Sequence, residues 1–149
     1  MLQNVNQFLS AFRTFHLVDR IFWEHGVAFQ DPKIHDATQL ECHRSLNGLP
    51  GASAYWSIDA RTLANGGNIL VHAGVHWHGG ERESFVQVTH DQRADEWFVT
   101  ACVLGGITPA DLFALAGDLG VERNRAKKIS AEEAHERVAM LAEFIKRRL

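Results

Sequence analysis

The sequence predicts an α+β fold, with an antiparallel sheet of about five strands and one N-terminal and two C-terminal helices packed mainly on one face. Three observations predict it. Apolar residues recur with helical spacing near the N-terminus, five segments in the middle of the chain resemble strands, and two segments with helix-start signals follow them. Runs of strands followed by runs of helices are typical of α+β proteins.

The first helix is predicted over Gln3 to His25. Its apolar residues recur every three or four positions, which places them on one side of a helix. They are Val5, Phe8, Phe12, Phe15, Val18 and Phe22. Gly26 follows as a helix stop. Trp23 and Trp56, which lie on or next to apolar stripes, are expected in the core.

The clearest strand is predicted over Ala52 to Asp59, because apolar and polar residues alternate there with a period of two. Four further segments are strand candidates: 38–45, 68–80, 84–90 and 96–106. The last of them is apolar on both faces, which favours an interior position in the sheet.

Two helices are expected to close the chain. The first has Thr108 as its N-cap and Pro109 at its first helical position. The second begins at Ser130, and Glu133 completes the spacing of a capping box. The basic segment "VERNRAKK" between them is expected to be a solvated loop rather than a nucleic-acid surface, since no aromatic residue is interleaved with its cations.

Length and composition favour a single cytoplasmic domain, 1–149. Hydrophobic residues make up 46% and charged residues 22% of the chain, as in ordinary globular proteins. The net charge of -3 is too small to favour nucleic acid or an acidic membrane surface as a partner. No apolar run approaches the roughly 18–20 residues of a membrane span, and the first residues lack the pattern of a signal peptide.

Three histidines fall within "LVHAGVHWHGG" and share one side of the predicted strand: His72, His76 and His78. The next strand returns through a hairpin and places Glu83 on the same face. A two-residue turn sets Glu83 opposite His76, and a four-residue turn sets it opposite His78. Either register leaves a carboxylate beside an imidazole.

The same face is expected to extend over the neighbouring strands. Gln87 and Thr89 join it from the returning strand, and the polar side of the strand at Ala52 to Asp59 adds more residues. These are Ser53, Tyr55, Ser57 and Asp59. An antiparallel sheet commonly leaves one face in water, so this face is not needed for the core.

The absence of known catalytic and cofactor-binding motifs favours a protein-binding domain. The chain has no phosphate-binding loop, nucleophile elbow, HExxH helix or CxxC pair. We expect a small protein-binding domain, of the general size and class of bacterial immunity proteins that inhibit a toxin. Its partner would be a toxin or a second copy in a homodimer, with no cofactor. The expected contact residues are Tyr55, His72, His76, His78 and Glu83.

A metal-dependent enzyme is the alternative. His76 and His78 lie two residues apart on one strand face, and Glu83 adds a carboxylate. Two imidazoles and one carboxylate suit a first-row divalent transition metal such as iron. The spacing resembles the first metal motif of the cupins, although Leu70 and His90 stand where cupins have glycines. The chain has too few strands for a cupin barrel, so the resemblance implies metal binding and not the fold.

Acid–base chemistry without a metal is a third interpretation. The polar residues include the histidine and carboxylate groups that such chemistry uses. The set is His72, His76, His78, His90, Tyr55, Asp59 and Glu83. The pattern singles out no catalytic residue among them.

Overall fold

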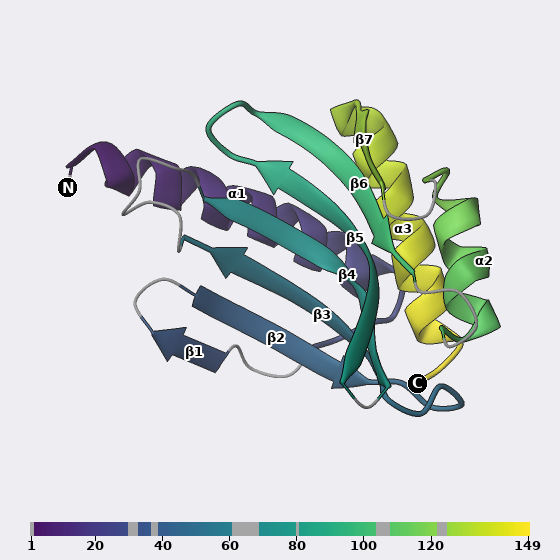
Figure 1. Cartoon of the computed structure of the whole chain (residues 1–149). Helices are drawn as coiled ribbons and strands as arrows, with labels where there is room; N and C mark the ends of the chain where they lie inside the picture. Colours follow the sequence, from purple (N-terminus) through teal and green to yellow (C-terminus); the bar gives the residue numbers. More distant parts are fainter. Residues whose placement is uncertain are drawn as a thin grey trace.

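A computed structural model describes residues 2–29, 33–36, 39–60, 69–79, 81–103, 108–121 and 125–149, with the backbone alone for 2–12 and 33–36. It confirms the α+β fold (Figure 1). The helices are α1 (Leu2–Glu24), α2 (Ala110–Asp118) and α3 (Ala131–Lys146). The strands are β1 (Lys33–Asp36), β2 (Gln39–Ser45), β3 (Ala52–Asp59), β4 (Leu70–Gly79), β5 (Arg82–Asp91), β6 (Glu96–Cys102) and β7 (Arg125–Ile129).

The described strands form one antiparallel sheet of seven, in which every strand pairs with its neighbours in the chain. The five expected strands are β2 to β6, and two short strands are added at the edges. One of them, β7, occupies the segment expected to be a loop and pairs with β6. Four of its five residues are exposed, so the segment lacks the alternation of buried and exposed positions that would indicate a strand. The interior position of β6 is confirmed.

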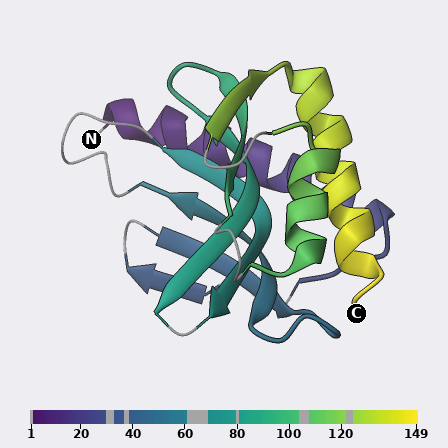
Figure 2. The ribbon, with the colours of Figure 1, turned by 45° about the vertical axis from the view of Figure 1, so that its right-hand side comes forward.

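The helices contact one face of the sheet, as expected. Helix α1 packs against β3 and β4, and α3 packs against β4, β5 and β6. Figure 1 shows α1 passing behind the strands, and Figure 2 shows α2 and α3 side by side. Alternate residues of the strands are buried against these helices, such as Ala54 and Trp56 on β3 and Val75 on β4. None of the helices in the described part of the chain covers the opposite face of the central strands.

The face of α1 predicted to be apolar packs against the core where its side chains are described. Val18 and Phe22 are buried, and the ring of Phe15 stacks on Trp56. Val5, Phe8 and Phe12 lie outside the described side chains. The prediction for Trp23 is wrong, because 71% of it is exposed. Successive residues of a helix lie about 100° apart around its axis. Trp23, which follows the buried Phe22 by one residue, therefore points away from the sheet.

The capping box of α3 is confirmed. Ser130 Oγ accepts a hydrogen bond from the Glu133 backbone N–H at 3.0 Å, and Glu133 Oε1 accepts one from the Ser130 N–H at 3.1 Å. The N-cap of α2 is Pro109 and not Thr108. The Thr108 hydroxyl instead lies 2.6 Å from the Ser84 hydroxyl of β5, in the buried interior. Among the described residues no helix is long and apolar enough to cross a membrane.

Candidate functional site

The strand register arranges the uncovered face in rows of side chains. Tyr55 of β3 is paired with His43 of β2 and Gly74 of β4, and Gly74 is paired with Gln87 of β5. One step along the strands, Ser57 lies between Glu41 and His72. These positions share a face because residues opposite each other in antiparallel strands point to the same side. The predicted polar face is thus confirmed.

The β4–β5 hairpin follows the second of the two expected registers. His78 is paired with Glu83, and His76 is paired with Phe85. This places the Glu83 carboxylate one row beyond His76, at the end of the polar face nearest the hairpin turn. His78 and Glu83 are both exposed, whereas His76 is half-buried.

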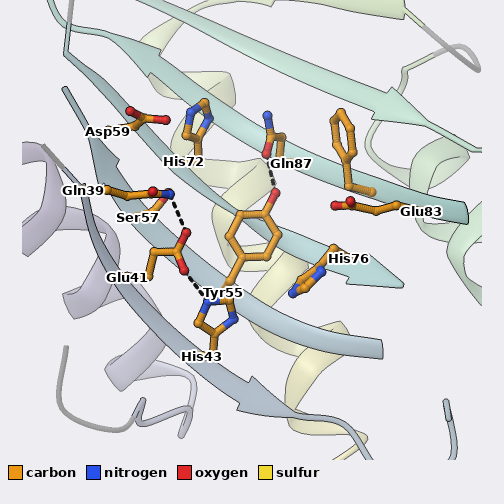
Figure 3. A pocket seen from close by; sticks show the side chains of 11 residues that line it. Gln39, Glu41, His43, Tyr55, Ser57, Asp59, His72, His76, Glu83 and Gln87 are labelled. Carbon is orange, nitrogen blue, oxygen red and sulfur yellow. Dashed lines mark hydrogen bonds and ion pairs between the residues drawn. The ribbon is translucent and has the colours of Figure 1, made fainter. Parts of the chain in front are cut away.

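The polar face is hollowed into a pocket of about 260 Å³, which we call the sheet pocket. Strands β2 to β5 all contribute to its lining, and Figure 3 shows their side chains converging around Tyr55. The lining residues are Gln39, Glu41, His43, Tyr55, Ser57, Asp59, His72, His76, Glu83, Phe85 and Gln87. The volume suits a small molecule and lies just below the common range of ligand sites.

Tyr55 lies at the centre of the sheet pocket. Its hydroxyl donates a hydrogen bond to Gln87 Oε1 on β5, across β4 (Figure 3). Burial raises the pKa of the Tyr55 hydroxyl well above its ordinary value, and the Glu83 and Glu41 carboxylates raise it further. Tyr55 is therefore a neutral hydrogen-bonding group at physiological pH, and it does not protrude as a contact anchor.

One end of the sheet pocket carries the carboxylates of Glu41 and Asp59, and that of Glu41 is held by neighbours on β2. Glu41 Oε1 accepts a hydrogen bond from Gln39 Nε2 at 2.6 Å, and Glu41 Oε2 is 2.8 Å from His43 Nε2. Asp59 stands beside Gln39 in the strand register. Figure 3 places Asp59 and Glu41 on the opposite side of Tyr55 from Glu83.

The other end carries the histidine pair. His76 Nδ1 and His78 Nε2 are 2.8 Å apart, and His76 Nε2 is 2.8 Å from Ser53 Oγ. Burial lowers the pKa of His76, and the neighbouring His78 and His43 imidazoles lower it further. His76 is therefore neutral at physiological pH, which is the form that ligates a metal.

Three potential metal ligands meet here. One ligand atom each of His76, His78 and Glu83 lies within 4.8 Å of the others. Zinc lies about 2.0–2.2 Å from nitrogen and oxygen ligands, so two ligands of one ion are at most about 4.3 Å apart. His78 and Glu83 are exposed, so their side chains have room to turn and bring the ligand atoms within that range. The residues present fit a single ion.

The predicted site residues divide into two groups. Tyr55, His72, His76 and Glu83 line the sheet pocket, and His78 lies beside it. His90, included in the acid–base interpretation, lies elsewhere. It is buried on the helix-covered face, where its Nδ1 is 3.1 Å from the Thr14 hydroxyl of α1.

Sequence reasoning missed the contribution of β2. Gln39, Glu41 and His43 alternate with Leu40 and the buried Cys42, and this pattern marks a polar side. Pairing that side with the polar side of β3 would have added these residues to the site.

Neither a protein-family model, nor a curated protein, nor a solved structure matches this chain.

Proposed function

We propose that this protein binds one divalent transition-metal ion through His76, His78 and Glu83 and uses it in an enzymatic reaction on a small molecule held in the sheet pocket. The observation that carries the proposal is the convergence of three ligand atoms, one from each residue, within 4.8 Å of one another. Two histidines and one carboxylate form a set that suits first-row metals and leaves coordination positions open.

The surroundings of His76 support this assignment. A metal-binding histidine commonly donates its second ring N–H to a neighbouring oxygen, which fixes the ring orientation. Ser53 Oγ, 2.8 Å from His76 Nε2, supplies that oxygen and leaves Nδ1 directed at His78. The ligand nitrogen of His76 would then be Nδ1, and that of His78 would be Nε2.

The position of the ion relative to the pocket supports catalysis rather than a purely structural role. Two of its three ligands, His76 and Glu83, also line the sheet pocket. A metal ion with open positions polarises a bound oxygen or lowers the pKa of a bound water. An ion at this end would do so next to the molecule in the pocket.

Metal titration of the purified protein tests the proposal. We expect calorimetry with Zn²⁺ or Co²⁺ to give one site per chain, and His76→Ala and His78→Ala to abolish it. Glu83→Gln should weaken binding by about tenfold or more. The visible absorption of bound Co²⁺ gives an independent readout of the coordination number.

Matched controls separate a built site from adventitious histidine binding. His72→Ala removes an imidazole from the same strand face, and His135→Ala removes an exposed one from α3. Both variants should keep the site. Folded wild-type protein that takes up no metal, or uptake that survives His76→Ala, would refute the proposal. Contact with a partner protein through this face, including inhibition of a toxin, stays a prediction.

A further inference from the structure

Gln87 of β5 presents an unpaired hydrogen-bond donor to the sheet pocket. Its Oε1 accepts a hydrogen bond from the Tyr55 hydroxyl, which fixes the orientation of the amide. Figure 3 shows the amide nitrogen on the side away from Tyr55. Within the described part of the chain, this nitrogen has no hydrogen-bond partner, and it is accessible rather than buried. Its two N–H groups are therefore available to a bound molecule.

The strand register places Gln87 close to the end of the pocket that carries the proposed metal ligands. His76 is paired with Phe85 of β5, and Gln87 follows Phe85 by two residues on the same face. Side chains at such diagonal positions are about 7–8 Å apart. Phe85 lies between Glu83 and Gln87 along this face and also lines the pocket. A short apolar chain lying along Phe85 therefore links the metal end to the Gln87 amide.

The metal ion and the Gln87 amide select different groups of a ligand. A divalent ion bound by the Glu83 carboxylate and two imidazoles keeps one positive charge, which one further carboxylate ligand balances. The Gln87 amide has no net charge, so a second carboxylate beside it would lose hydration without a compensating positive charge. An uncharged carbonyl oxygen accepts the same hydrogen bond at a smaller desolvation cost. A complementary ligand therefore carries a carboxylate at one end and an uncharged carbonyl at the other.

We propose that the sheet pocket takes a short-chain oxo acid, with its carboxylate on the metal ion and its carbonyl oxygen accepting a hydrogen bond from Gln87 Nε2. This inference rests on the proposed function for the carboxylate end only. The carbonyl end depends on Gln87 and on the Tyr55 hydroxyl that orients it, and neither residue is a proposed metal ligand.

Titration of the Co²⁺-loaded protein, followed by its visible absorption, tests this inference. The probes are unbranched acids of increasing length that end in a methyl ketone, of which levulinate is the shortest. Each is compared with the acid in which a methyl-bearing CH group replaces the carbonyl. The readout is the ratio of the two dissociation constants at each length, so that the affinity of the shared carboxylate for the metal cancels.

The decisive variant is Gln87→Glu. It keeps an oxygen for the Tyr55 hydroxyl but replaces the donor NH₂ group with an acceptor oxygen. We expect the preference for the oxo acid to fall by about two- to tenfold at the best length, as for the loss of one hydrogen bond between uncharged groups. Because both probes carry the same carboxylate, the added charge affects them alike.

Thr100→Val is the matched control, because Thr100 is paired with Gln87 on β6 and valine replaces its hydroxyl with a methyl group. This variant should keep the wild-type ratio. A ratio that Gln87→Glu leaves unchanged at every length, on protein with one bound Co²⁺, overturns this inference and leaves the proposed function standing.

If the protein binds no Co²⁺, the proposed function fails, and the carbonyl end is tested alone. Acetone is then titrated into the metal-free protein while NMR follows the side-chain N–H signals of Gln87, which are identified by their loss in Gln87→Glu. A saturable shift of these signals supports the carbonyl end, and the absence of a shift overturns it.

Discussion

Gly74 lies directly between Tyr55 and Gln87 in the register of the sheet, and the Tyr55 hydroxyl reaches Gln87 across it. A Cβ atom added at Gly74 would lie 2.3 Å from the Val86 backbone oxygen and 2.7 Å from Gln87 Cβ. The neighbouring strand therefore approaches too closely for any side chain at this position. Glycine is required here by contact and not by its φ angle.

We expect Gly74→Ala to lower the free energy of unfolding by about 1–3 kcal/mol, the usual cost of forcing atoms into a packed site. Chemical denaturation measures it. Gly117→Ala on α2 is the matched control, because its added Cβ meets nothing within 4 Å. That variant should be stabilised by about 0.4–1 kcal/mol, since alanine has less freedom to lose on folding. Equal effects of the two substitutions would contradict the contact argument.

Tyr55 is the only tyrosine in the chain, so tyrosinate absorbance reports on it alone. Its pKa in the folded protein is raised above the ordinary 10.0 by burial and by Glu83 and Glu41. We expect no tyrosinate signal on raising the pH through 10 while the protein stays folded. Because the unfolded chain loses this proton first, Tyr55 contributes stability below about pH 10 that is lost as the pH rises further. A midpoint of tyrosinate formation near pH 10 in the folded protein would contradict this expectation, because it would show that the Tyr55 hydroxyl is hydrated.

Thr14 and His90 link α1 to β5 in the interior. His90 Nε2 is 2.8 Å from Asp95 Oδ1, so in the neutral ring Nδ1 is left to accept from the Thr14 hydroxyl at 3.1 Å. Thr14→Val removes that donor, and we expect a loss of about 1–3 kcal/mol in unfolding free energy. In a double-mutant cycle with His90→Phe, the combined loss should be smaller than the sum of the two single losses. Strict additivity would show that the two groups do not interact.

The capping box of α3 makes stability depend on pH. The pKa of Glu133 is lowered by its hydrogen bond to the Ser130 backbone and then by that to the Ser130 side chain. Its contribution is therefore present above the ordinary pKa of 4.5 and is lost as the pH falls through the lowered value. Ser130→Ala should cost about 1 kcal/mol at neutral pH and make the acid limb of the stability curve shallower. Ser130→Thr keeps a capping hydroxyl, so a loss as large as that of Ser130→Ala would count against this explanation.

Much of the fold could be predicted because the apolar residues that become buried recur at regular spacing in the sequence. The alternation at Ala52 to Asp59 identified β3 with its bounds, and the even-numbered histidines of β4 identified the polar face. β7 could not be recognised, since its exposed Arg125, Lys127 and Lys128 carry no such period. Its strand conformation comes from pairing with β6.

The candidate site was predictable only in part. The sequence places His76, His78 and Glu83 on one hairpin, so their proximity follows from local register. Glu41 and His43 come from β2, which is joined to the site by its pairing with β3. Whether the face is flat or hollowed depends on how the strands twist together, and no spacing rule specifies that. The sheet pocket therefore became visible only in three dimensions.

The chain-order pairing of the strands has a consequence for how the protein folds. Five of the six ladders between the described strands join segments with no helix between them, so the loop closed before each of these pairings is short and its entropic cost is small, whereas the β6–β7 ladder closes across α2. The β4–β5 hairpin has the longest strands, and we expect it to be the nucleus from which the sheet grows in both directions. The contact between α1 and α3 spans nearly the whole chain. Refolding kinetics should therefore show the two ends of the chain meeting last, after the sheet that separates the helices from the pocket has formed.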